Sequence, residues 1–456
     1  MTPEALHALR ATLTGDALIP TDAAFPDALV IWNGTVDKHP ALIVRCASTD
    51  DVIAAVNFAR DQGLGVSVRA GGHHVAGSSL IDDGLVIDLS QMRGVEVDSS
   101  NNTVRAQGGA LIGDVDRATQ QHSLAVPLGL VSETGVAGLT LAGGLGWMRR
   151  KHGHSSDNLI AADVVTADGV LVHASPTANP DLFWALRGAG WDLGVVVNFE
   201  YQAHPLGPEV WVPFVAYAWS GARQVIQRFR EFAATAPEGL SVICVCWTVP
   251  EIDAFPKDAW GERMVVILGP YVGSVDEGRE ASKELPSFGT VLADLSGVMP
   301  WTEAQLLFDE DYPKGRRYYW RSTYLQDLPD AAIDILIDQT EKRPSLLTSL
   351  DIWQLGGAID RVAPTDTPMA HRGAPFLIGI EANWENAADD AANRDWTKAV
   401  SAALEPFSTG GSYMNFEDPD DAAATAAAYG ANLERLRTVK QHYDPNNLFR
   451  SRRGLS

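Results

Sequence analysis

The pattern of apolar and polar positions along the chain changes near residue 205. Before this point, short apolar runs with strand-like alternation are separated by glycine-rich turns and brief helical stretches. Strands or hairpins are predicted at 41–48, 64–72, 84–90, 95–106, 159–174 and 194–204, and helices at 49–62 and 180–188. The first part of the chain is therefore expected to consist of short strands joined by tight turns.

Beyond residue 205, longer apolar runs alternate with longer amphipathic helices. Helices are predicted at 222–236, 328–340, 395–407 and 420–443, and strands at 244–249, 263–272, 318–325, 349–357 and 376–384. Nine of the 13 tryptophans lie between Trp211 and Trp396, which indicates an aromatic-rich sheet face in this part of the chain. Plain core packing is the simpler explanation for most of these tryptophans.

The composition indicates a folded enzyme-sized protein and excludes several classes of partner. With 456 residues, 46% of them hydrophobic and 20% charged, the chain predicts two or three packed units. Its formal net charge of −23 argues against nucleic acid or a membrane surface as a partner and favours cationic or neutral small molecules as substrates. The three cysteines cannot form a disulfide framework, and neither a signal peptide nor a membrane-spanning stretch is visible. A cytoplasmic protein is the resulting expectation.

Two glycine-rich segments carry the candidate chemistry. Residues 69–78 read Arg-Ala-Gly-Gly-His-His-Val-Ala-Gly-Ser and follow a predicted strand. Residues 135–146 contain five glycines, a density that favours a loop around a ligand over a regular helix. Glycines let the backbone approach a flat or phosphorylated ligand and point N–H groups at it, which suits an acidic protein with few basic residues to spare. A metal site is not predicted, because adjacent histidines on an extended chain point to opposite faces.

Five ordered motifs resemble the FAD-linked oxidases of the vanillyl-alcohol oxidase superfamily, in the branch of berberine-bridge-enzyme-like and 6-hydroxy-D-nicotine-oxidase-like proteins. They are R-x-GGH-x-x-x-G at 69–77, GVAGLTLAGGLGW at 135–147, DN-L…VTADG at 157–169, LFWALRG-x-G…GVV at 182–196, and Y-x-N with N-x-x-RL…YDP-x-N-x-F at 413–449. The resemblance covers nearly the whole chain. It implies an α+β fold of two domains: a discontinuous PCMH-type FAD-binding domain at 1–207 with 421–456 returning to it, and a substrate domain at 208–420 whose antiparallel sheet is flanked by helices.

The resemblance also implies how FAD is held. His73 would bond covalently to the flavin, and Val131 stands where many relatives carry a cysteine that forms a second link, so a single histidyl link is expected. Thr134 takes the position that in relatives helps to set oxygen access, and residues 188–193 depart from the family pattern. Cofactor contacts are predicted for Arg69, Ala70, Gly71, Gly72, His73, His74, Gly77, Ser78, Thr134, Gly135, Gly138, Gly143, Gly144, Gly146, Asn158, Val196 and Asn432.

Oxidation of a C–OH or C–NH centre also needs a group that takes the proton of the heteroatom. The resemblance places Tyr413 there, and a buried tyrosine satisfied by a carbonyl is the structural alternative. Other relatives use a glutamate on a strand that faces the flavin. Glu381 would occupy such a position, although it could equally point to solvent from an amphipathic strand.

The strand predicted at 349–357 places Asp351 and Trp353 on one face and Gln354 on the other. Gln354 and Tyr324 are the residues predicted to contact substrate. The expected reaction is oxidation of an alcohol, sugar or amine by hydride transfer to flavin N5, with O2 reoxidising the flavin to give hydrogen peroxide. A dehydrogenase that uses another electron acceptor and a flavin-binding protein without turnover are the alternatives.

Overall fold

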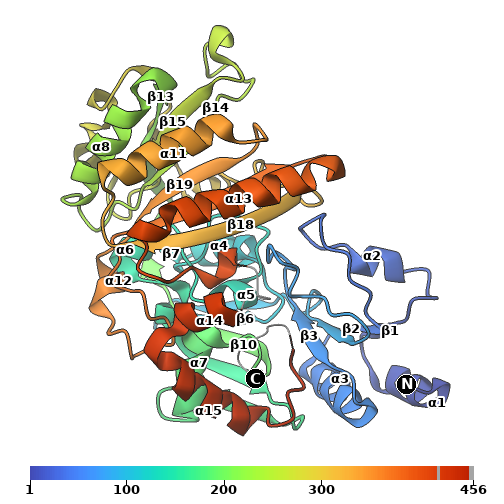
Figure 1. The fold of residues 1–456 in the computed structure, drawn as a ribbon. Helices are drawn as coiled ribbons and strands as arrows, with labels where there is room; N and C mark the ends of the chain where they lie inside the picture. Colours follow the sequence, from blue (N-terminus) through green and yellow to red (C-terminus); the bar gives the residue numbers. More distant parts are fainter. Residues whose placement is uncertain (418–421, 451–456) are drawn as a thin grey trace.

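A seven-stranded antiparallel sheet with three long helices on one face forms the upper part of the molecule, and two smaller sheets form the lower part (Figure 1). The computed structural model describes residues 1–417 and 422–450. None of the helices within these ranges is long and apolar enough to span a membrane. The arrangement confirms the predicted α+β fold with an antiparallel sheet flanked by helices.

The first of the two smaller sheets has four strands and is formed by the N-terminal residues. Its strands, in spatial order, are β1 (Asp16–Leu18), β2 (Leu42–Arg45), β4 (Leu85–Asp88) and β3 (Val66–Arg69). Helices α1 (Pro3–Thr12) and α3 (Thr49–Gln62) cover it. α3 begins where the Ser48 hydroxyl accepts a hydrogen bond from the Asp51 N–H at 3.2 Å, and it ends at Gly63, whose φ is 67°. The buried face of α3 explains its spacing of valines and alanines.

The second small sheet has five antiparallel strands and supports the site. Its strands, in spatial order, are β5 (Val95–Asp98), β6 (Thr103–Gln107), β10 (Val195–Gln202), β8 (Leu159–Val165) and β9 (Leu171–Ala174). The helices of this part are α4 (Ile112–Gln120), α5 (Val136–Leu141), α6 (Arg149–His152) and α7 (Pro180–Ala189), whereas α2 (Phe25–Leu29) packs on the four-stranded sheet. One apolar core joins residues of this sheet to residues of α4, α5 and α7.

The prediction that the glycine-rich stretch 135–146 forms a loop throughout was wrong in its first half. Residues Val136–Leu141 form the helix α5, and irregular backbone begins only at Ala142. Five of the six residues of α5 are buried against the core that this helix shares with α7. This burial outweighs the cost of about 1 kcal/mol that Gly138 adds inside a helix.

The C-terminal part of the chain returns to the N-terminal sheets. Helices α14 (Ala422–Tyr429) and α15 (Leu433–Tyr443) share a core with α7, and Figure 1 shows α15 beside α7. Beyond them, the Val66 N–H donates to the Leu448 carbonyl at 2.8 Å, and the Arg450 N–H donates to the Val66 carbonyl at 3.0 Å. The return therefore extends as far as the edge of β3; its predicted first residue, 421, lies outside the described residues.

The seven-stranded sheet occupies the second half of the chain. Its strands, in spatial order, are β16 (Val291–Asp294), β13 (Phe214–Ala218), β15 (Arg263–Leu268), β14 (Ile243–Thr248), β19 (Ser349–Gln354), β20 (Phe376–Trp384) and β18 (Arg317–Leu325). Helices α8 (Ala222–Ala233), α11 (Asp330–Lys342) and α13 (Asp390–Leu404) cover its outer face, and the other face turns toward the smaller sheets (Figure 1). All nine residues of β20 are buried, because the strand lies between two cores.

The remaining elements connect these layers. They are the ribbons β7 (Leu124–Ala125) with β11 (His204–Pro205) and β12 (Glu209–Val212) with β17 (Gly297–Pro300), and the helices α9 (Val275–Ser282), α10 (Trp301–Ala304) and α12 (Ala358–Arg361). β11 is the last strand paired with the N-terminal part, and β12 pairs within the second half. This change of partner supports the proposed domain boundary at residue 207.

Two adjacent arginines of α6 fasten the large sheet to the smaller ones. Arg149 is fully buried and donates to the carbonyls of Gln354 and Val242 at 2.8 and 2.7 Å. Arg150 donates to the carbonyls of Leu355, Pro237, Leu240 and Ala236 at distances of 2.7 to 3.0 Å. These carbonyls end β19 and flank β14, so the two guanidinium groups fix the position of that sheet over the smaller ones.

Arg149→Met should lower the free energy of unfolding by at least about 2 kcal/mol, because buried carbonyls lose charged donors. The midpoint of urea unfolding measures this change. Arg361→Met is the matched control: Arg361 is exposed and pairs only with Glu238 on the surface, so the loss should stay below about 1 kcal/mol. Equal losses in the two variants would contradict a fastening role for Arg149.

Candidate active site

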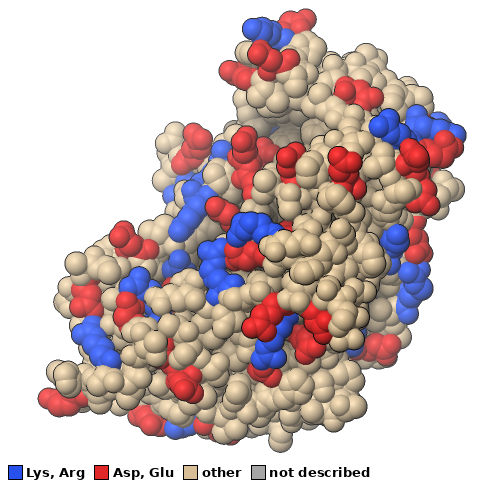
Figure 2. All heavy atoms as spheres, turned by 180° about the vertical axis from the view of Figure 1, so that it is seen from behind, with Lys and Arg blue, Asp and Glu red and all other residues tan. Residues whose placement is uncertain are grey.

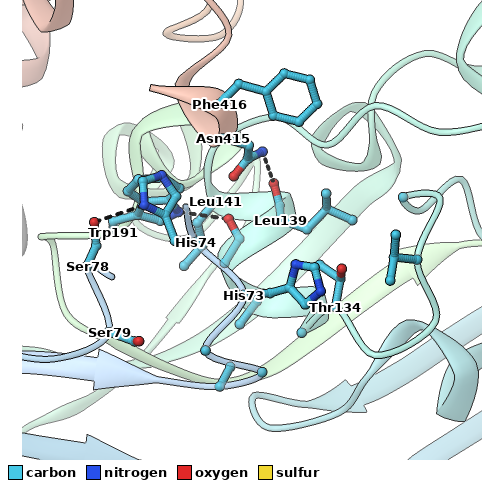
Figure 3. Close-up of a pocket in the computed structure, with 18 of the residues that line it drawn as sticks. His73, His74, Ser78, Ser79, Thr134, Leu139, Leu141, Trp191, Asn415 and Phe416 are labelled. Carbon is cyan, nitrogen blue, oxygen red and sulfur yellow. Dashed lines mark hydrogen bonds between the residues drawn. The ribbon is translucent and has the colours of Figure 1, made fainter. Parts of the chain in front are cut away.

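A cavity lies between the inner face of the seven-stranded sheet and the N-terminal part of the molecule. It encloses about 1400 Å³, part of it open to solvent. Its floor consists of residues from the loop after β3, the segment around α5 and the start of β10, and its roof consists of residues from β18, β19 and β20 and the segment 413–416. Figure 3 shows the floor side with His73, His74 and Thr134. The cavity is thus built from segments distant in sequence.

Glycines bring two parts of the floor into direct backbone contact. A Cβ on Gly71 would lie 2.4 Å from the Gly135 nitrogen, and a Cβ on Gly135 would lie 2.4 Å from the Gly71 nitrogen. Neither position can carry a side chain without moving the other segment. Gly138 has no atom within 4 Å of its Cβ position, so the cavity reaches its backbone directly. A flat ligand can therefore lie against bare backbone here.

His73 has an unsatisfied nitrogen in this cavity. Its Nε2 is buried and has no hydrogen-bond partner. The ring stacks on Trp32 at 4.2 Å between centroids, and Trp32 stacks in turn on Tyr318 at 3.7 Å. Desolvation lowers the pKa of His73 to about 3, so the imidazole is neutral near pH 7. A neutral imidazole with a nitrogen that lacks a hydrogen-bond partner fits a site where a bound group contacts the ring.

His74 differs from its neighbour in its hydrogen bonds. Its Nδ1 accepts the Ala76 N–H at 3.2 Å, which leaves the proton on Nε2, and Nε2 contacts the Met414 carbonyl at 3.2 Å. Ser78 adds a further contact to Nδ1 at 3.2 Å (Figure 3). His74 is thus held by the protein itself. Within the described ranges, no three His, Cys, Asp or Glu side chains gather that could hold a metal ion.

Tyr413 is buried at the roof and receives hydrogen bonds at its hydroxyl oxygen. The Leu145 N–H donates to it at 2.9 Å, and Asn415 Nδ2 donates to it at 2.8 Å. The orientation of the Asn415 amide is determined by its surroundings, because Nδ2 also faces the Leu139 carbonyl, which can only accept (Figure 3). Burial raises the pKa of Tyr413 to about 12, and the donors at its oxygen act in the opposite direction.

Two carboxyl groups lie beside each other on the roof. Glu381 of β20 and Asp351 of β19 hydrogen-bond through their carboxyls, which requires a proton between them. The Tyr312 hydroxyl donates to Glu381 Oε2 at 2.7 Å. Burial raises the pKa of Asp351 to about 7, and burial together with the nearby Asp351 charge raises the pKa of Glu381 well above its usual range. The pair therefore carries at most one negative charge near neutral pH.

The cross-strand register explains why these carboxyls meet. Asp351 lies opposite Gly379, two residues before Glu381 on the same face of β20. A Cβ on Gly379 would lie 2.9 Å from Glu381 Oε1, so the glycine leaves the space in which that carboxyl group lies. The predicted faces of both strands agree with this arrangement.

Of the residues predicted to contact cofactor or to act in catalysis, twelve line the cavity: Ala70, Gly71, Gly72, His73, His74, Ser78, Thr134, Gly135, Gly138, Val196, Glu381 and Tyr413. Seven predicted cofactor contacts lie elsewhere: Arg69, Gly77, Gly143, Gly144, Gly146, Asn158 and Asn432. Arg69 donates to the Val30 carbonyl, and the Asn158 and Asn432 amides donate to backbone carbonyls of neighbouring loops. The acceptors, Val30, His152, His154 and Pro364, belong to residues that do not line the cavity.

The two residues predicted to contact substrate do not face the main cavity. Gln354 points away from it and donates to the Ala233 carbonyl at the end of α8, because it alternates with Trp353 along β19. The expectation of a substrate contact at Gln354 therefore does not hold for this cavity. Tyr324 lines a smaller cavity of about 420 Å³, which also borders Tyr413.

Several lining residues were not among the predicted site residues. The aromatic walls come from Trp191, Phe308, Tyr312, Trp320, Trp353 and Phe416. The large number of tryptophans in the second half of the chain predicted an aromatic sheet face. The alternation along the predicted strand placed Asp351 and Trp353 on one face. Tyr312 and Phe308 lie outside the strands, where alternation gives no signal.

Comparison with known proteins adds independent findings. A family described as "FAD binding domain" matches residues 40–175, and one described as "Berberine and berberine like" matches residues 412–456. An FAD-linked oxidoreductase of Dictyostelium discoideum is 30% identical over 422 residues, covering 92% of this chain and 89% of the relative.

Two solved structures of oxidases share the fold. The structure of 6-hydroxy-D-nicotine oxidase from Arthrobacter nicotinovorans has a TM-score of 0.85 at 28% identity and covers 97% of this chain and 98% of its own. A glucooligosaccharide oxidase from Acremonium strictum, described as carrying 6-S-cysteinyl, 8α-N1-histidyl FAD, has a TM-score of 0.84 at 25% identity, with 98% of each chain covered. These likenesses extend over both halves of the molecule.

The carboxyl pair should make the folded protein less stable as pH rises. An unfolded carboxyl ionises near pH 4, whereas the folded pair keeps a proton to higher pH, so folding takes up protons and stability falls from about pH 4 through the raised pKa of about 7. Replacing both groups as Asp351→Asn with Glu381→Gln should raise the melting temperature relative to the wild type more at pH 8 than at pH 5. A difference in melting temperature between variant and wild type that is the same at pH 5 and pH 8 would contradict a proton shared by the two carboxyls.

Proposed function

Because the chain belongs to the berberine-bridge-enzyme-like FAD-linked oxidoreductases, we propose that it is an oxidase that holds FAD covalently through His73 and oxidises an alcohol, sugar or amine. FAD would supply the hydride acceptor, its N5, and would pass the electrons to O2 to give hydrogen peroxide. One observation carries the proposal. A buried tyrosine, Tyr413, and a histidine whose Nε2 has no hydrogen-bond partner, His73, line the same cavity.

The floor of the cavity supports the assignment of the cofactor site. The contacting backbones at Gly71 and Gly135 leave space for a flat group, and Gly138 exposes its backbone to the same space. His73 would hold the flavin, because its neutral imidazole keeps one nitrogen without a partner, whereas both nitrogens of His74 have partners. A histidyl link in the related glucooligosaccharide oxidase agrees with this choice.

The positions of the cysteines indicate how many covalent links the protein can form with the flavin. Val131 lines the cavity at the position where many relatives carry the second linking residue. The chain has three cysteines: Cys46 is buried against α3, and Cys244 and Cys246 are buried on the helix-covered face of the large sheet. None of them lines the cavity. The proposed enzyme therefore carries a single link.

Tyr413 would accept the proton that leaves the substrate. It can do so only as the phenolate, and its oxygen is already placed to accept from the Leu145 N–H and from Asn415 Nδ2. The same donors stabilise the phenolate, which offsets part of the cost of charging a buried tyrosine. Proton transfer to Tyr413 Oη, as the substrate hydride leaves, is general-base catalysis at a stated atom.

Glu381 is the second candidate for the base. It lines the same cavity, but its carboxyl already binds the Tyr312 hydroxyl and shares a proton with Asp351. A carboxyl that holds a proton near neutral pH has to lose it before it can accept another. Tyr413 also has to lose a proton first, but the donors at its oxygen favour its ionisation, whereas the Asp351 charge opposes the ionisation of Glu381, and this difference favours Tyr413 as the base.

His73→Ala should abolish covalent flavin while leaving the fold intact, because the side chain lies at the edge of a preformed cavity. The measurement is yellow fluorescence of the protein band on a denaturing gel, which reports attachment independently of activity. His74→Ala is the matched control and should keep the fluorescence. A fluorescent His73→Ala band would contradict the assignment.

Tyr413→Phe should slow reduction of the flavin by substrate about 10²- to 10⁴-fold, the usual cost of losing a positioned base. Anaerobic rapid mixing isolates this half of the reaction, and covalent flavin should be unchanged. Tyr324→Phe, a buried tyrosine bordering the neighbouring cavity, is the control and should reduce at nearly the wild-type rate. A Tyr413→Phe rate within about threefold of wild type would move the role to Glu381, tested by Glu381→Gln.

The electron acceptor is tested on the same sample. Reduced enzyme mixed with air-saturated buffer should regain its yellow absorption and release hydrogen peroxide. A reduced spectrum that persists in air would assign a dehydrogenase, and a flavin that no alcohol, sugar or amine bleaches would assign a binding protein.

A further inference from the structure

The imidazole of His73 is restrained by a ring contact and not by a hydrogen bond at Nε2. This nitrogen has no partner, and the ring lies nearly parallel to the indole of Trp32, with 4.2 Å between the ring centroids and 19° between the planes. The neighbouring His74 is restrained in the other way, by contacts at both ring nitrogens, and its contact with the Trp191 ring is edge-on at 80°. The plane of the His73 ring therefore depends on Trp32.

Trp32 contacts His73 from outside the cavity. His73 lines the cavity, whereas Trp32, which is only 2% exposed, does not. The Trp32 N–H donates to the carbonyl of Gly72, the residue before His73, at 3.2 Å, so the two segments are also joined through their backbones. A change of the Trp32 side chain can therefore move the His73 ring without removing any residue that lines the proposed space for FAD.

The indole of Trp32 is itself held by residues from the second half of the chain. Its Nε1 donates to the Tyr312 carbonyl at 2.8 Å, and the Trp32 carbonyl accepts the Gly315 N–H at 2.8 Å. Tyr318 of β18 stacks on the indole with 3.7 Å between centroids and 11° between planes. Two rings so close to one indole cannot share a face of it without overlapping, so the indole lies between Tyr318 and His73.

Covalent attachment of FAD depends on the orientation of the imidazole. A C–N bond would form between a nitrogen of His73 and the flavin 8α carbon, the position of the histidyl link in the related glucooligosaccharide oxidase. One C–H bond of that carbon would break, its electron pair would pass to the flavin ring, and the carbon and the imidazole would each give up one proton. O2, the electron acceptor of the proposed function, would take the electron pair and two protons to give hydrogen peroxide. The lone pair of the attacking nitrogen lies in the plane of the ring, so the tilt of that plane decides whether it meets the carbon.

We propose that Trp32 is a positioning residue for flavin attachment, because its indole holds the His73 ring at the angle from which the imidazole nitrogen meets the flavin. The inference rests on the proposed function, which assigns the covalent link to His73. The χ2 torsion of a histidine has broad minima, and a misplaced reacting group loses about 10²-fold in rate. The stack also excludes water from one face of the imidazole, which favours the neutral form with a free lone pair.

Trp32→Leu and Trp32→Phe test this role in the full-length protein, produced in cells limited for riboflavin and then mixed with FAD. FAD bound to the native protein is measured after gel filtration, and attached FAD is measured at successive times by the yellow fluorescence of the denatured band. Trp32→Leu should bind FAD within about threefold of the wild type but attach it at least about tenfold more slowly, because the flat ring is lost. Trp32→Phe should attach FAD within about threefold of the wild-type rate, since it keeps a flat ring beside His73.

Trp301→Leu is the matched control. Trp301 is a buried tryptophan of the same apolar core, donates through Nε1 to Asp116 at 3.1 Å and does not line the cavity, so attachment should stay within about threefold of the wild-type rate. Tyr318→Leu removes the ring on the other face of the Trp32 indole and should slow attachment about three- to tenfold. It carries the test if Trp32→Leu does not fold, and an unchanged rate of attachment would then overturn the inference.

The outcomes separate this inference from the proposed function. Wild-type protein that binds FAD and never attaches it would overturn the covalent link, and the inference with it. Attachment at the wild-type rate in Trp32→Leu, or equal slowing in Trp32→Leu and Trp301→Leu, would overturn the inference alone. A Trp32→Leu variant that loses FAD binding to the same extent as attachment would also overturn it, because the residue would then support the cavity as a whole and not the His73 ring.

Discussion

Arg149 and Arg150 of α6 carry the constraint on which the site depends. Each guanidinium group lies buried between the halves of the molecule and donates to carbonyls at the ends of β19 and β14. A buried cation without its hydrogen bonds would be very costly, so the strands are held at the positions where their carbonyls meet these donors. The roof of the cavity is attached to the floor through these bonds.

This attachment determines which side chains share the cavity. β19 and β20 present Asp351 and Glu381 to the floor that carries His73, and the segment after the large sheet brings Tyr413 to the backbone of Leu145. Burial raises the pKa of all three acidic groups on the roof, but their surroundings differ. The two carboxyls share a proton, whereas Tyr413 has N–H donors at its oxygen. The same desolvation thus yields a carboxyl pair that keeps a proton and a tyrosine whose donors favour the form that accepts one.

The face of the molecule seen in Figure 2 carries charges of both signs. Figure 2 shows acidic and basic side chains interspersed over the face opposite to that of Figure 1, without a continuous basic area on that face. The proposed chemistry depends on the ionisable groups buried in the cavity, Tyr413 and the carboxyl pair. Coulomb interactions there are stronger than at the surface because the local dielectric constant is lower.

Local patterns in the sequence predicted a large part of this architecture. The helix at 49–62 matches α3, and alternation placed Asp351, Trp353 and Glu381 on faces that the structure keeps. The carboxyl pair could not be predicted, because it depends on a cross-strand register that no single strand encodes. The sequence motif alone also could not distinguish His73 from His74 by their hydrogen bonds. The helix α5 was missed because tertiary burial outweighed the low helix propensity of its glycine.

A crystal structure of the flavin-loaded protein tests the central claim most directly. The account predicts continuous electron density from the His73 imidazole to the flavin. It also predicts a flavin ring that lies in the cavity and faces Tyr413 and the carboxyl pair. Flavin attached to another residue, or a flavin ring lying away from Tyr413 and the carboxyl pair, would contradict it.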